Sequence, residues 1–146
     1  MRRLRIASVL VGVLMLALVG ATAATANGGQ MLAADLDGAS EVPGPGDPDG
    51  SGSATVTVNR GLGEVCWWID VQGIDQAIAA HIHVGDAGVA GPVVVGLTPP
   101  GSDGTSTGCA TVDRDLAKAI GKDPSSYYVN VHNPAYPAGA LRGQLG

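Results

Sequence analysis

The sequence predicts an all-β fold, an antiparallel Greek-key sandwich or barrel of about eight short strands with one short helix. Short runs of β-branched and aliphatic residues alternate with hydroxyl-bearing or polar residues. This period of two is typical of a strand with one buried face. Turns rich in glycine, proline and aspartate separate the runs at regular intervals, as in small sandwiches and barrels.

The strands follow one another along the chain with only one long gap, the loop 39–52, where Gly, Pro and Asp dominate. The turn 61–63 joins two strands into a hairpin, and in the second of these Trp67 is expected to anchor a core that contains no Phe. The expected strands are 31–38, 53–58, 64–71, 80–85, 93–97, 105–112, 127–132 and 140–145.

The one helix is predicted between the sixth and seventh strands. Asp113 can cap its N-terminus, and Leu116 and Ile120 share one face at a spacing of four. Gly121 is expected to end the helix, and Pro124 prevents it from resuming.

The N-terminus has the pattern of a secretory signal peptide, residues 1–26. A basic start is followed by an apolar run from residue 6 to residue 19 and then by small residues, with cleavage after Ala26 or, second, after Ala23. The apolar run is shorter than the roughly 20 residues that span a membrane, which leaves an uncleaved anchor as the less favoured alternative. We therefore expect a mature domain of residues 27–146, without a membrane span, that is secreted or held at the cell envelope.

The charge balance is acidic. The whole chain carries 8 basic and 13 acidic side chains, a net charge of −5. Removal of residues 1–26 leaves 5 basic side chains against the same 13 acidic ones, a net charge of −8. A domain this acidic, without a basic cluster, is a poor partner for nucleic acid or an anionic membrane, and it attracts cations.

Two cysteines remain in the expected mature domain, Cys66 and Cys109. In an exported protein they are expected to form a disulfide, and both have the outward parity of their strands. The alternatives are that they ligate a metal or stay free thiols.

All three histidines of the chain lie in two strands. His81 and His83 alternate with inward-facing Ile82, and His132 has the same outward parity as Tyr128 and Asn130. The three imidazoles should therefore lie on the outer face of the sheet. Two imidazoles at i and i+2 can reach one ion, and a third from a neighbouring strand would complete a three-nitrogen metal site. Asn130 or Asp86 are candidates for groups that orient the rings.

Several stretches together resemble the CHRD domain, a module named after chordin and also found in secreted bacterial proteins. They cover most of residues 32–145, and the resemblance implies an extracellular β-sandwich with little implied about activity. The matching stretches are Leu36-Asp37-Gly38-Ala39-Ser40-Glu41-Val42-Pro43, Ala80-His81-Ile82-His83-Val84-Gly85, Gly91-Pro92-Val93-Val94-Val95, Tyr127-Tyr128-Val129-Asn130-Val131-His132, Tyr136-Pro137-Ala138-Gly139 and Leu141-Arg142-Gly143-Gln144-Leu145.

The histidine strands also resemble, more weakly, the copper-ligand strands of copper/zinc superoxide dismutases. In that family a His-x-His strand and a later strand ending Val-His bind copper on the outer face of a Greek-key barrel. His81, His83 and His132 match these positions, and Arg142 lies in a region comparable to that of the catalytic arginine. The chain departs from the family because it has no histidine left to bridge copper to zinc, nor to complete a zinc site.

Three functions compete at this point. The first is a copper-binding domain, with zinc as the competing ion and with redox or superoxide-related activity open to it. The second is a non-catalytic extracellular structural or protein-interaction module with an exposed aromatic patch of Trp68, Tyr127, Tyr128 and Tyr136. The third, an enzyme without a metal, lacks any recognisable nucleophile, paired-carboxylate or phosphate-binding motif.

Overall fold

The computed structural model describes residues 28–146, so the predicted signal peptide lies outside the described residues. These residues form eight strands, one α-helix and one 3₁₀ turn. In order they are β1 (Gln30–Asp37), β2 (Ser51–Asn59), β3 (Glu64–Gln72), β4 (Ala79–Val84), β5 (Val93–Leu97), β6 (Thr105–Thr111), α1 (Arg114–Lys122), η1 (Pro124–Ser126), β7 (Tyr127–His132) and β8 (Leu141–Gln144).

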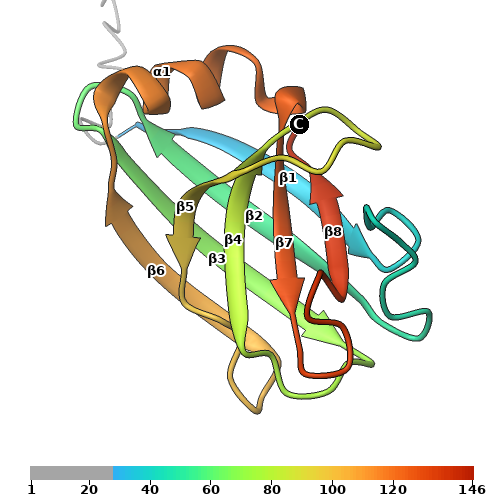
Figure 1. The fold of residues 1–146 in the computed structure, drawn as a ribbon. Coiled ribbons are helices and arrows are strands. Elements are labelled where there is room, and N and C mark those ends of the chain that lie inside the picture. The colour runs from blue at the N-terminus through green and yellow to red at the C-terminus, as the bar shows by residue number, and fades with distance from the viewer. Residues whose placement is uncertain (1–27) are drawn as a thin grey trace, which may run out of the picture.

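The strands form one antiparallel sheet, in the order β5-β4-β7-β8-β1-β2-β3-β6, that folds over on itself. Figure 1 shows the result as two crossing layers, with β4, β5, β7 and β8 in front of β1, β2, β3 and β6. The layers are joined at β8 and β1 by the pair Asp37–Arg142 and by two backbone hydrogen bonds between Ala33 and Gly146. The chain crosses between layers after β3, after β5 and, through α1 and η1, after β6. The predicted all-β Greek-key architecture is confirmed as a nearly closed barrel.

The core lies between the two layers and is built from the inward half of each strand. Trp67 is buried in it, and its indole ring packs against Gly108 on the paired strand, where a Cβ would lie 2.4 Å from the ring. The indole N–H donates to Ser106 Oγ at 3.1 Å, so the buried polar atom is satisfied.

The turn and helix predictions hold with one correction. Gly63 adopts a positive φ of 67° in the hairpin between β2 and β3, which suits glycine. Asp113 caps α1 by accepting a hydrogen bond from Asp115 N at 2.7 Å. The helix does not end at Gly121 but continues to Lys122, because the backbone N–H of Asp123 still donates to the carbonyl of Ala119 and makes Asp123 the C-cap.

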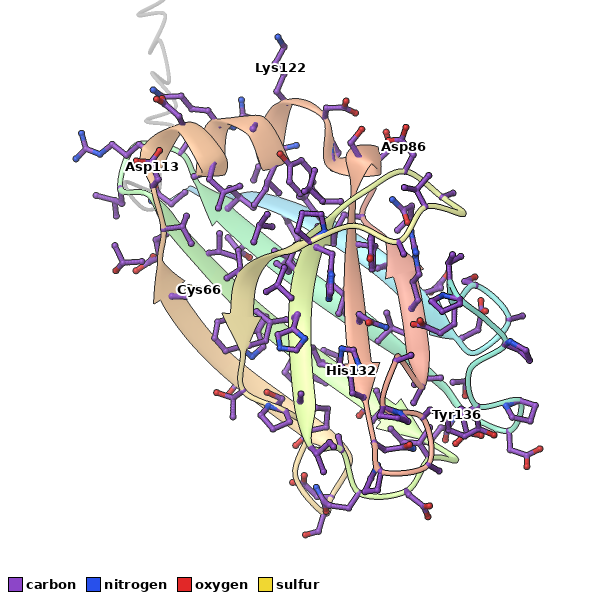
Figure 2. All side chains as sticks on the ribbon, viewed as in Figure 1. Cys66, Asp86, Asp113, Lys122, His132 and Tyr136 are labelled. Atoms are coloured by element: carbon purple, nitrogen blue, oxygen red, sulfur yellow. A yellow bond between two sulfur atoms is a disulfide. The ribbon has the colours of Figure 1, made fainter. Side chains whose placement is uncertain are left out.

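The predicted disulfide between Cys66 and Cys109 is present. The two residues are direct partners across β3 and β6, with their Cα atoms 4.0 Å apart. Cys66 lies on the layer opposite the histidine strands, as Figure 2 shows. The cysteines are therefore not metal ligands.

The predicted exposed aromatic patch is wrong. Tyr127 and Tyr128 are buried, and Tyr136 is half-buried against the core, so only Trp68 is exposed, at 47% of its surface. Tyr127 faces the core, Tyr136 packs against the core, and the hydroxyl of Tyr128 accepts a hydrogen bond from Gly91 N in the segment after β4. Within residues 28–146, no helix combines the length and the apolar character needed to cross a membrane.

Candidate metal centre

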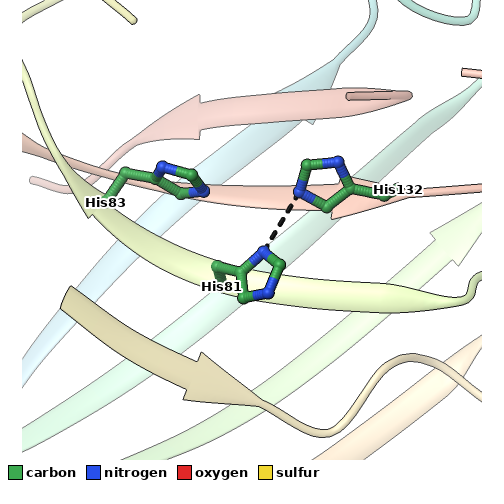
Figure 3. Close-up of side chains that lie close together, drawn as sticks. All are labelled: His81, His83 and His132. Atoms are coloured by element: carbon green, nitrogen blue, oxygen red, sulfur yellow. Dashed lines mark hydrogen bonds between the residues drawn. The ribbon is translucent and has the colours of Figure 1, made fainter. Parts of the chain in front are cut away.

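The three histidines converge on the outer face of the pair β4–β7. His81 and His83 stand two residues apart on β4, and His132 ends β7 opposite Ala79, so that it lies diagonally beside His81. Aliphatic residues between them face the core. The alternation of the two strands thus brings all three rings together on one side, as Figure 3 shows.

The rings are close enough to share an ion. His81 Nδ1 lies 3.1 Å from His132 Nε2. The centroids of the His81 and His83 rings are 5.5 Å apart, and those of His83 and His132 are 6.3 Å apart. One nitrogen from each ring can be chosen so that the three lie within 4.8 Å of one another.

Backbone carbonyls orient two of the rings. His83 Nδ1 lies 2.8 Å from the carbonyl oxygen of Gly91, and His132 Nδ1 lies 3.1 Å from that of Pro137. A carbonyl can only accept, so each Nδ1 carries the proton and each Nε2 presents a lone pair. This arrangement, with the distal nitrogen bonded to a carbonyl, is typical of metal-binding histidines.

The Nε2 atom of His83 is buried and has no hydrogen-bond partner within residues 28–146. Buried polar atoms in proteins are normally satisfied, and an orphaned acceptor is costly. The Gly91 carbonyl is bonded to Nδ1, so the unpartnered atom is the other ring nitrogen of His83. A cation at the centre of the cluster would satisfy it.

The surroundings of His81 and His132 favour the neutral form of these two imidazoles. Burial lowers the pKa of His81, and the neighbouring His132 and His83 lower it further. Burial also lowers the pKa of His132, outweighing the opposing effect of its hydrogen bond to Pro137. Only neutral imidazole binds metals, so these shifts favour binding at neutral pH.

The donor set fits a first-row transition metal after a small adjustment. Two nitrogens bonded to one ion at about 2.1 Å are at most about 4.2 Å apart. A separation of 4.8 Å would therefore have to shrink by about 0.6 Å for two nitrogens on opposite sides of the ion, and by about 1.4 Å at a tetrahedral angle, which side-chain rotation can supply. Three imidazoles without carboxylates suit copper or zinc rather than magnesium or calcium.

The cluster is open on one side. His83 and His132 are only 9% exposed, whereas His81 is half-buried. The residue opposite His81 on β5 is Gly96, and a Cβ placed there would meet no atom within 4 Å. Solvent and a fourth ligand can therefore approach along the β5 side.

Arg142 is separated from the cluster by an aromatic ring. His83 stacks on Tyr128 with centroids 4.8 Å apart and planes inclined by 11°. The guanidinium carbon of Arg142 lies 3.5 Å from the centre of the same ring. Both groups cannot occupy one face at these distances, so Tyr128 lies between them and Arg142 does not face the histidines.

The two predicted ring-orienting groups contact other partners. Asn130 donates to Glu41 and to the carbonyl of Leu141. The Asp86 carboxylate accepts from Ser126 Oγ at 2.8 Å, and in Figure 2 it lies near α1 while His132 lies toward the opposite end. The contacts to the rings come instead from Gly91 and Pro137.

Sequence analysis missed the carbonyl partners and the roles of Tyr128 and Glu41. The carbonyls carry no residue-type signal. Glu41 is only 5% exposed, although it lies in a loop expected to be solvated. Its appearance in a stretch that matched the CHRD domain was the one available sign of importance.

A comparison with protein-family models found one that matches residues 32–145, described as the CHRD domain. The match covers every strand except the first two residues of β1. A comparison with curated proteins found none that matches the sequence.

Proposed function

The chain belongs to the CHRD domain family, and we propose that it is an extracytoplasmic member that binds one copper ion through His81, His83 and His132. CHRD domains are typically extracellular, and the Cys66–Cys109 disulfide fits that setting. The proposed route of export is the signal peptide of residues 1–26, cleaved after Ala26.

The observation that carries the metal proposal is the orphaned Nε2 of His83. It is buried, its tautomer is set by the Gly91 carbonyl, and it points its lone pair at the side of the ring where the other two histidines lie. A purely structural histidine would have both nitrogens satisfied.

Copper is favoured over zinc by affinity, since copper binds a given nitrogen donor set more tightly than zinc does. Zinc remains the competing ion because it also accepts three imidazoles and one open position. A bound copper ion would supply one-electron redox chemistry, and superoxide is a candidate reactant. The protein's own part is to hold three neutral imidazoles, with the carbonyls of Gly91 and Pro137 fixing two of them.

Metal titration of residues 27–146 tests this proposal, by calorimetry and copper EPR. The expected result is one copper per chain with nitrogen hyperfine structure, lost in His81→Ala/His83→Ala. Asp47→Ala/Asp49→Ala is the matched control, because it removes two acidic side chains from a loop without touching the cluster. Copper binding that survives loss of the histidines but falls in the control would overturn the proposal.

A non-catalytic interaction module is the second candidate, and the exposed Trp68 favours it. Trp68 lies on the opposite layer from the histidines, so the two candidates can be separated. Binding of an extracellular partner that is lost in Trp68→Ala and retained in His81→Ala/His83→Ala would support the module.

A further inference from the structure

Arg142 is a buried cation with an open hydrogen-bonding position. Its side chain is 1% exposed. Its Nη2 donates to the carbonyl of Asp86 at 2.9 Å and to Gln144 Oε1 at 3.2 Å. Its Nη1 is buried and has no partner within the described residues. A guanidinium group carries five N–H donors, so this leaves an unmet demand for acceptors.

Among residues 28–146, no carboxylate lies within ion-pair distance of this charge. In the part of the chain that the structure describes, the one ion pair closer than 4.0 Å is Lys118–Asp115, on the helix surface. Glu41 is near enough to feel the charge of Arg142 but forms no ion pair with it. The face of Tyr128 compensates part of the charge. A buried charge without a counter-ion is strongly unfavourable, so an anion is the missing element.

Arg142 is one of the residues that line a cavity of about 250 Å³. This cavity lies between the loop after β1, the loop after β4 and strand β8, and its lining includes Ser40, Glu41, Ala87, Gly88, Arg142 and Gln144. The cavity is large enough for a ligand of several non-hydrogen atoms.

We propose that this cavity binds a small carboxylate anion, paired with the open Nη1 of Arg142. The planar carboxylate matches the guanidinium as a charge-assisted acceptor. A single negative charge is favoured over a dianion such as phosphate, because Glu41 lines the same cavity and the domain as a whole is acidic. Free small carboxylates and the C-terminal carboxylate of a peptide share this chemistry.

The carboxylate site is distinct from the histidine cluster. Its lining contains no histidine, and the Tyr128 ring lies between Arg142 and His83. Anion binding should therefore persist when the metal ligands are removed. A failure of the carboxylate proposal can thus be distinguished from a failure of the metal proposal.

The test is an NMR titration of metal-free protein, following the side-chain Nε–Hε signal of Arg142. Acetate is added against sodium chloride at matched ionic strength, at a pH of about 8. We expect a saturable shift with acetate only, unchanged in His81→Ala/His83→Ala. Glu41→Gln should tighten acetate binding by about tenfold, because it removes a like charge from the cavity without changing its shape.

Arg142→Met is the direct variant, but loss of a buried stacked side chain can unfold the domain, so Glu41→Gln and the wild-type titration decide the matter. A tripeptide with a free C-terminus and its C-terminal amide distinguish the sources. Tighter binding of the free-acid peptide than of acetate would identify a partner's C-terminus as the ligand. Tighter binding of acetate than of the peptide would identify a free, metabolite-sized carboxylate. Equal binding of acid and amide, or shifts that chloride reproduces, would overturn the proposal.

Discussion

His81 Nδ1 and His132 Nε2 lie 3.1 Å apart across β4 and β7, a distance that requires one of them to donate. His132 already donates from Nδ1 to the carbonyl of Pro137, so in its neutral form its Nε2 must accept. His81 is therefore the donor and carries its proton on Nδ1. A metal that takes the Nε2 lone pair of His132 must break this hydrogen bond.

This assignment predicts a tautomer change on metal binding. Long-range ¹H–¹⁵N correlation spectra of the metal-free protein should show His81 protonated on Nδ1, and His83 and His132 also protonated on Nδ1. Zinc, which is diamagnetic, should move the His81 proton to Nε2 if Nδ1 becomes the ligand. A metal-free His81 spectrum of the Nε2-protonated form would contradict the assignment.

Copper affinity should fall at low pH, and the lowered pKa values of His81 and His132 should move that fall to below pH 6.5. Burial lowers the pKa of His81 and of His132 below 6.5, so both are neutral at pH 7. Affinity should be nearly flat above about pH 7. Below the lowered pKa values it should fall by up to about tenfold per pH unit for each imidazole that loses a proton on binding.

Competition titrations between about pH 5 and pH 8 measure this profile. The same shifts mean that the unfolded chain binds protons more readily than the folded one. The histidine contribution to the stability of the metal-free protein therefore rises with pH between the lowered pKa and 6.5. Affinity that already weakens above pH 7 would show that the imidazoles are not held neutral.

The contribution of Glu41 to the stability of the domain should fall as the pH rises, whereas the histidine contribution rises. Burial raises the pKa of Glu41 from 4.5 to about 7, even though Arg142 and the hydrogen bond from Asn130 act to lower it. The folded state thus holds the proton more tightly, and stability is lost as pH rises from 4.5 through 7. Glu41→Gln should stabilise the domain at about pH 8, by up to about 3 kcal/mol, and have little effect at about pH 4.

Urea unfolding of Glu41→Gln and wild type, both metal-free, checks this difference at each pH. The histidine contributions are common to the two proteins and cancel. A variant less stable than wild type at pH 8 would mean that the ionised carboxylate is stabilised by Arg142 after all.

The fold was predictable because its signals are local. Alternation in each strand determines which residues face the core, and the turns follow from their glycines and prolines. The same alternation placed the three histidines on one face. That His132 lies beside His81 and His83 could be inferred only on the assumption that β4 and β7 pair.

The burial of the outer face was not predictable, because it depends on loops that pack far from their place in the sequence. Asn130 was expected beside the histidine rings, yet it binds Glu41, 89 residues away. Likewise, the segment after β4 covers Tyr128 by a contact between Gly91 and the tyrosine hydroxyl. No period or motif in either loop indicates where it will lie.

The disulfide should stabilise the domain without contributing to the metal site. Cys66→Ser/Cys109→Ser opens a loop whose ends are 43 residues apart in sequence. The chain-entropy relation gives a loss of about 4 kcal/mol for a loop of this length. Denaturant unfolding should show that loss, while the copper stoichiometry stays at one per chain. Loss of copper from a variant that is still folded would contradict the separation of the two layers.

Gly96→His offers a gain-of-function test of the site's geometry. Gly96 is the direct partner of His81 on β5, so a side chain there projects from the same face. Space is available, because a Cβ at Gly96 would meet no atom within 4 Å. A fourth imidazole should complete a four-nitrogen zinc site and tighten zinc binding by at least about tenfold.

Gly96→Gln is the matched control, since it adds similar bulk without an imidazole. Competition with a chromophoric chelator measures both variants. If the two bind zinc equally, the open coordination position does not lie on the β5 side of His81.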